Sequence, residues 1–168
     1  MQEAEIEQTP EGQVPAGDGW FIRNLGEMAW ETAPGFGAWL GFFAGAHVHV
    51  LQPGETNGLY HSEAAHEGFL VLSGECIAVV EGEERRMRRW DYFHSPPGTE
   101  HITVGAGDEP CAILMFGSPD PSRKVEWIAN EVAAKYGASV AKTTSRDTEA
   151  YGELPEIVRV RPPKPFGG

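Results

Sequence analysis

Hydrophobic and polar residues alternate along this chain in short runs. From Asp18 onward, aromatic and β-branched residues gather in brief groups that end at Gly, Pro or Asn. Such runs, bounded by turn residues and without a helical period, are typical of antiparallel strands. The predicted strands are Trp20–Asn24, Trp39–Ala44, Ala46–Leu51, Gly68–Leu72, Glu75–Val80, Arg85–Trp90, Tyr92–Ser95, Glu100–Val104 and Cys111–Gly117. We therefore expect an all-β fold, a small antiparallel sandwich or barrel.

The pattern divides the chain into three regions. Residues 1–17 are polar and rich in Glu, Gln, Gly and Pro, which predicts a flexible arm. Residues 18–118 carry the predicted strands and form the barrel. Residues 119–168 have a different pattern, with one stretch of helical spacing followed by a polar, Pro-rich tail.

The C-terminal region contains the one segment with helical spacing. Between Arg123 and Tyr136, apolar residues recur every three or four positions, and Gly137 follows as a stop signal. This spacing predicts a single amphipathic helix packed on the outside of the barrel. The rest is expected to lie along the surface or along a partner subunit, and Ile157, Val158 and Val160 indicate a short added strand.

Composition narrows the class of protein. At 168 residues, with 40% hydrophobic and 23% charged residues, the chain fits one ordinary globular domain. Its net charge of −12 argues against nucleic acid or an anionic membrane as a partner, because like charges repel. The acidic N-terminus lacks the apolar core of a signal peptide, so we expect a cytoplasmic protein.

Two local features have ordinary structural explanations. The basic run Arg85–Arg89 directly follows the acidic run Glu81–Glu84, which favours a hairpin with charge pairs between its strands over an anion site. Cys76 and Cys111 are too few for a thiolate zinc site and lie in apolar runs. We interpret both as small buried hydrophobic residues.

The residues that indicate chemistry begin at His61. Glu63 follows two positions later, so on extended chain both side chains face the same side. Glu67 shares a face with Phe69 and Val71, and a bare carboxylate among apolar side chains costs several kcal/mol unless it is neutralised. A divalent metal ion would neutralise it, and imidazole and carboxylate are ligands that Zn, Fe, Mn and Ni accept.

A second segment, some thirty residues further on, contributes another histidine. A Pro-Pro-Gly turn at residues 96–98 leads to His101 at the start of a predicted strand. If the two strand pairs are neighbours in one barrel, His101 completes the site that His61 opens.

These two segments resemble the motifs of the cupin family. His61, Glu67 and Gly74 match the first motif, including its six-residue gap between Glu and Gly. The second motif, an acidic turn followed by Pro-x-Gly-x-x-His, is matched by Asp91, Pro96, Gly98 and His101. The resemblance is specific for fold, whereas family members range from dioxygenases to binding modules, so it says little about function.

The resemblance implies a double-stranded β-helix barrel, or jelly roll, with His61, Glu67 and His101 as metal ligands. Glu63 stands where the family usually has a second histidine. We predict that Glu63 is the fourth ligand, so the site holds one divalent ion (Zn, Mn, Fe or Ni) and favours Mn, Fe or Zn over Cu. His66, one residue before Glu67, is an alternative fourth ligand if a bulge turns it inward.

The other histidines are candidates for a second role. His47 and His49 lie on one face of a predicted strand, and the simplest interpretation is that this is the polar outer face. The alternative is that His49 lines the cavity. His94 lies two residues before Pro96 and is a second candidate for the pocket. We take His49 and His94 as the candidate acid/base groups.

Three functions remain open. The leading one is a metal-dependent enzyme, an oxygenase or an isomerase, acting on a small molecule inside the barrel. The alternative is a non-catalytic, metal-stabilised module that binds a small ligand. The third is that the barrel mainly builds a homodimer, through edge strands or terminal segments, and such a dimer is compatible with either of the other two functions.

Overall fold

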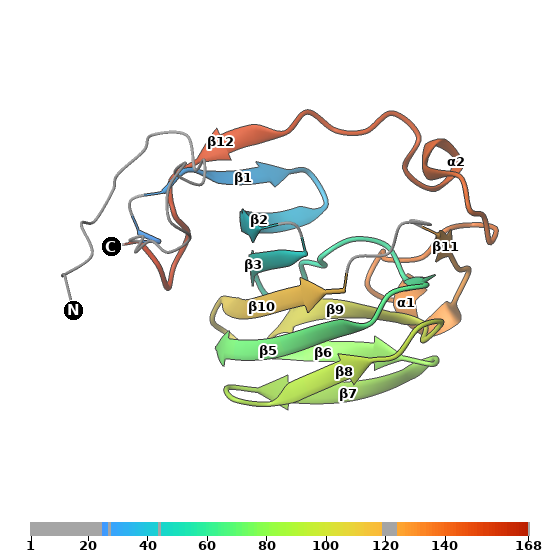
Figure 1. Cartoon of the computed structure of the whole chain (residues 1–168), viewed down its shortest axis with the longest axis horizontal. Coiled ribbons are helices and arrows are strands. Elements are labelled where there is room, and N and C mark those ends of the chain that lie inside the picture. The colour runs from blue at the N-terminus through green and yellow to red at the C-terminus, as the bar shows by residue number, and fades with distance from the viewer. Residues whose placement is uncertain (1–24, 27, 44, 119–123, 168) are drawn as a thin grey trace.

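The computed structural model describes residues 25–26, 28–43, 45–118 and 124–167 (Figure 1). The predicted N-terminal arm, 1–17, and the predicted strand Trp20–Asn24 lie outside these residues. The strands are β1 Trp30–Ala33, β2 Phe36–Phe43, β3 Ala46–Leu51, β4 His61–Glu63, β5 Glu67–Ser73, β6 Glu75–Val80, β7 Glu83–Arg88, β8 Tyr92–Ser95, β9 His101–Ala106, β10 Cys111–Gly117, β11 Val125–Trp127 and β12 Val158–Val160. The helices are α1 Glu131–Ala134 and α2 Asp147–Tyr151.

The strands form two antiparallel sheets. The larger has the order β12-β1-β2-β3-β10-β5-β8 and the smaller the order β11-β4-β9-β6-β7. In Figure 1 the paired strands β1 and β12 lie at one end of the molecule, and β7 and β8 lie together at the other. The predicted all-β, antiparallel jelly-roll barrel is confirmed, and none of the helices in the described part is long and apolar enough to cross a membrane.

The core lies between the two sheets. Its cluster includes Phe69 and Val71 of β5, as the alternation predicts, together with both cysteines, Cys76 and Cys111. Glu67, at the start of the same strand, is a polar neighbour of this core. An apolar barrel interior thus ends at a carboxylate, as the sequence indicated.

Two further apolar clusters cover the outer faces of the sheets. On the larger sheet, Trp30 is fully buried against Val48 and Val50, and Phe166 of the tail packs on it. On the smaller sheet, Tyr60 and Ile102 pack against Ala133 of α1. The C-terminal region therefore packs on the outside of both sheets, and the tail adds β12 beside β1, as its apolar residues indicated.

The predicted helix over 123–136 is wrong in its first half. Val125–Trp127 is a strand paired with β4, and the backbone N–H groups of Trp127 and Ile128 donate to the carbonyls of Thr144 and Tyr60. These hydrogen bonds occupy two backbone N–H groups that a helix would need for hydrogen bonds within itself. The helix begins only after Asn130, whose side chain accepts from the backbone N–H groups of the first turn.

The acidic run forms the turn and the start of β7, the basic run continues β7, and β7 pairs with β6 in the predicted hairpin. Arg86 pairs with Glu75 across the two strands, with 2.6 Å between guanidinium nitrogen and carboxylate oxygen, and Arg85 pairs with Glu83 on its own strand. Both arginines thus have carboxylate partners, in agreement with the hairpin interpretation.

Candidate metal centre

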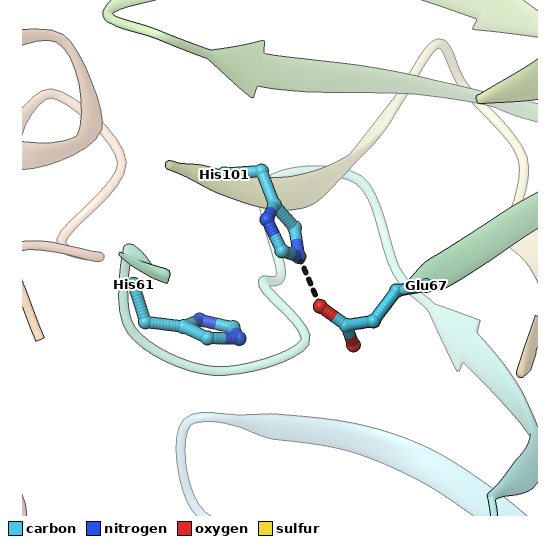
Figure 2. A group of neighbouring side chains, drawn as sticks. All are labelled: His61, Glu67 and His101. Atoms are coloured by element: carbon cyan, nitrogen blue, oxygen red, sulfur yellow. Dashed lines mark ion pairs between the residues drawn. The ribbon is translucent and has the colours of Figure 1, made fainter. Parts of the chain in front are cut away.

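Three strands from the two sheets bring His61, Glu67 and His101 together (Figure 2). His61 on β4 and His101 on β9 are directly opposite each other in the smaller sheet, and their ring centroids are 4.8 Å apart. Glu67 comes from β5 of the larger sheet and points across the barrel at them. One ligand atom from each residue lies within 4.8 Å of the other two.

Backbone carbonyls orient both imidazoles. Nδ1 of His61 lies 2.6 Å from the carbonyl oxygen of Leu59, and Nδ1 of His101 lies 3.0 Å from that of Thr99. Because a carbonyl only accepts hydrogen bonds, each Nδ1 carries a proton, and Nε2 is the nitrogen that each neutral ring would offer to a metal. Ser95 Oγ adds a third contact, 3.2 Å from Nδ1 of His101. This arrangement is typical of histidines that bind a metal through Nε2.

Two buried atoms at the centre lack properly directed hydrogen bonds within the described part of the chain. They are Nε2 of His101 and Oε2 of Glu67, which lie 3.1 Å apart and form an ion pair when His101 is protonated. Buried polar atoms are rarely left unsatisfied, because each loses its hydration without compensation. A divalent cation would satisfy both at once, so the donor set fits a metal ion.

The histidines of the centre differ in their proton affinity. Burial, and then the neighbouring His101, lower the pKa of His61 to about 4. Burial also acts to lower the pKa of His101, but contact with the Glu67 carboxylate outweighs it and leaves that pKa raised. Without a metal, His101 and Glu67 thus share a charge interaction that a metal ion would replace.

Glu63 lies beside this group but not within it. Its Oε1 is 3.7 Å from Nε2 of His61, and it lines the cavity in front of the centre. The structure thus brings together three of the four predicted ligands and places the fourth in the adjoining wall.

The centre lies in a cavity of about 400 Å³, and His49 faces it. The His49 ring stacks on Trp39, and its Nδ1 is buried and has no hydrogen-bond partner in the described part of the chain. Burial, and then His47, lower the pKa of His49 to about 4, which keeps the ring neutral near pH 7. Of the two positions that the sequence left open for His49, the structure shows the one in the cavity.

His94 does not lie in this cavity. Glu67 pairs with Ser95 and Gly68 with His94, so strand alternation turns Ser95 inward and His94 to the outer face. There His94 is exposed and stacks on His66, with 3.1 Å between Nε2 of His94 and Nδ1 of His66. The expectation that His94 lines the pocket is therefore wrong, and His66 is not turned toward the centre either.

The cavity wall also contains two aromatic residues that were not predicted from the sequence, Trp127 on β11 and Tyr151 on α2. The indole Nε1 of Trp127 donates to the Tyr151 hydroxyl at 3.3 Å, and the rings meet edge to face. The alternation in Val125–Trp127 was the available signal, but the helical spacing of the neighbouring residues masked it.

Residues 47–117 match the family model of the cupin domain. Solved structures similar to the chain include a sugar phosphate isomerase from a cupin superfamily of Silicibacter pomeroyi DSS-3, with 25% identity over 48% of this chain and 52% of that one and a TM-score of 0.44. They also include KdgF from Halomonas sp., with 22% identity over 55% and 90% of the two chains and a TM-score of 0.46.

A third similar structure is the DMSP lyase DddQ from Ruegeria pomeroyi DSS-3, with 27% identity over 48% of this chain and 40% of that one and a TM-score of 0.42. The aligned part spans about half of the length of the isomerase and less of the lyase. A comparison with curated proteins found no match.

Proposed function

Through residues 47–117 this chain belongs to the cupin superfamily, and from that premise we propose that it is a metal-dependent enzyme acting on a small molecule in the barrel. The ion is a divalent first-row metal (Zn, Mn, Fe or Ni). The observation that carries the proposal is the convergence of two imidazoles and one carboxylate, with unsatisfied central atoms, at a cavity large enough for a small ligand.

His61, Glu67 and His101 would hold the ion through Nε2, a carboxylate oxygen and Nε2. Two histidines and one carboxylate are the donor set of non-haem Fe(II) oxygenases, and three protein ligands leave positions open, as catalytic sites require. When bound, such an ion supplies either Lewis-acid polarisation, as in an isomerase, or oxygen chemistry, as in an oxygenase.

The protein's own residues add a proton acceptor. His49 is neutral near pH 7 and lines the cavity, so its ring is able to accept a hydrogen bond or a proton from a ligand there. Trp39 holds the ring by stacking. Trp127 and Tyr151 supply an aromatic part of the same wall.

Metal analysis of three variants tests the site. We expect wild-type protein purified without added metal to contain about one first-row divalent ion per chain, and Glu67→Gln and His61→Ala to lose most of it, because each removes one of three ligands. His94→Ala, a histidine removed on the outer face, is the matched control and keeps the metal. Equal metal content in all four proteins would refute the assignment.

The open coordination position separates the enzyme from a non-catalytic binding module. With Mn²⁺ in the site, water bound to the ion speeds the relaxation of bulk water protons. We expect this enhancement in the wild type, because three protein ligands do not fill an octahedral shell. A fully bound ion without the enhancement would favour the structural role instead.

A further inference from the structure

Two histidines outside the metal cavity lie side by side at the surface. His66 lies just before β5 and His94 lies on β8, and both residues are exposed. Their rings are nearly parallel, with an interplanar angle of 14° and 5.4 Å between the ring centroids. Nδ1 of His66 lies 3.1 Å from Nε2 of His94. The pair therefore brings two ring nitrogens together on the outer face of the larger sheet.

The separation of these nitrogens is that of two ligands on one metal ion. Imidazole nitrogens bind Zn²⁺ at about 2.0–2.1 Å, so two of them on one tetrahedral or octahedral ion are about 2.9–3.4 Å apart. Without an ion, one ring donates a hydrogen bond to the other. At an exposed position such a bond contributes little, because water competes for both nitrogens. An ion that replaces the shared proton would bind both nitrogens with little movement of the rings.

Hydrogen bonds of the backbone hold both histidines in place. The backbone N–H of His66 donates to Oγ of Ser118 at 3.1 Å, and the His66 carbonyl accepts from the backbone N–H of Ser118 at 2.9 Å. His94 is paired with Gly68 within the sheet. Because both backbones are fixed before an ion arrives, binding loses less conformational entropy than it would with histidines on mobile loops.

We infer that His66 and His94 form a second metal site, on the surface of the barrel, that takes a late first-row divalent ion such as Zn²⁺, Ni²⁺ or Cu²⁺. Both donors are imidazoles, which these ions accept, whereas Mn²⁺ prefers oxygen ligands. The proposed central site includes a carboxylate, so the two sites differ in the ions that they select. Two protein ligands hold an ion more weakly than three, so the surface site fills only when metal is added.

Calorimetric titration of the metal-free protein with Zn²⁺ tests the inference. We expect the wild type to bind two ions, the second more weakly than the first. His66→Ala and His94→Ala are each expected to lose the weaker site and to keep the tighter one, which also shows that both variants are folded. His61→Ala is the reciprocal variant, and it is expected to lose the tighter site and keep the weaker one. Zn²⁺ binding by His66→Ala or His94→Ala that equals that of the wild type would overturn the inference.

A titration with Mn²⁺ tests the class of ion. We expect His94→Ala to bind Mn²⁺ as the wild type does, because the surface site offers this ion no oxygen ligand from the histidine pair. A loss of Mn²⁺ binding in His94→Ala would contradict the proposed selectivity. The Zn²⁺ titration also separates this inference from the proposed function. If only the central site were absent, His61→Ala would bind Zn²⁺ as the wild type does, and His94→Ala would bind none.

Discussion

At the scale of single residues, Gly74 shows why the first motif needs a glycine. It lies in the turn between β5 and β6 with a φ of +70°, a conformation that side chains with a Cβ rarely adopt. A Cβ there would also overlap the carbonyl oxygen of Pro110. Both conformation and space therefore require glycine between the strand of Glu67 and the next one.

A comparison of Gly74→Ala with Gly54→Ala separates the effect of backbone conformation from the effect of missing space. Gly54 also has a positive φ, of +83°, but open space where a Cβ would lie. We expect Gly54→Ala to cost about 1 kcal/mol of unfolding free energy from backbone strain alone. Gly74→Ala is expected to cost about 1–3 kcal/mol more, because backbone atoms must move. Urea unfolding measures both, and equal losses would contradict the packing argument.

His49 makes the stability of the barrel depend on pH. Its pKa is about 4 in the folded protein and about 6.5 when unfolded, so the unfolded chain binds more protons between these values. Stability is therefore full above pH 6.5 and falls as the pH drops toward 4, by up to about 3 kcal/mol from this residue. We expect chelator-treated His49→Gln to show a shallower fall than the chelator-treated wild type, measured by urea unfolding at each pH. Parallel curves would contradict it.

The convergence of His61, Glu67 and His101 could be expected from the sequence because the side to which each points follows from strand alternation. Glu67 shares its face with Phe69 and Val71, so its inward position follows from their burial. The orientation of His94 was predicted wrongly because it depends on which residue of β5 pairs with it. No local sequence pattern predicts that pairing. Glu63 lies two residues after His61, but the short strand β4 leaves its side chain in the wall of the cavity.

At the scale of elements, the sequence located most strands of the barrel and misjudged the region after it. The segments Ala46–Leu51, Glu75–Val80, Tyr92–Ser95 and Cys111–Gly117 have the predicted bounds, since turn residues limit each of them. After residue 124 the deciding contacts are long-range, such as the pairing of β11 with β4. Apolar spacing alone does not reveal such contacts.

The start of α1 gives a direct test at this scale. Asn130 Oδ1 accepts from the N–H groups of Val132 and Ala133 at 2.9 and 3.0 Å. We expect Asn130→Ala to lower the unfolding free energy by about 1 kcal/mol, whereas Asn130→Asp, which keeps the acceptor, stays near the wild type. Unfolding in urea measures the difference, and metal content serves as the control that the barrel is intact. Equal losses in both variants would contradict the capping role.

At the scale of the whole molecule, one end of the larger sheet exposes aromatic surface. Tyr92 on the edge strand β8 and Phe116 on β10 stack with 6.1 Å between ring centroids, and 54% and 42% of their surfaces are exposed. Exposed apolar groups at a sheet edge favour association. We propose that a homodimer covers this face.

Light scattering during gel filtration tests this proposal. We expect the wild type to elute with the mass of two chains and Phe116→Asp to shift toward one, because a charge would be buried in the interface. Leu154→Asp, an exposed leucine in the C-terminal region, is the control. A wild type of one chain at micromolar concentration would contradict the proposal.

A metal at His61, Glu67 and His101 would join the two sheets, since β4 and β9 belong to one and β5 to the other. Any ion that binds only the folded state adds stability, about 3–4 kcal/mol when free metal exceeds the Kd by 100- to 1,000-fold. For a chain of this size that corresponds to a rise in Tm of about 5–15 °C. We therefore expect a chelator to lower the Tm of the wild type by that amount and leave that of His61→Ala unchanged, as calorimetry would show. A chelator effect of equal size in both proteins would mean that the stabilising ion lies elsewhere. The difference between them isolates the contribution of this centre, because the variant keeps the remaining contacts between the sheets.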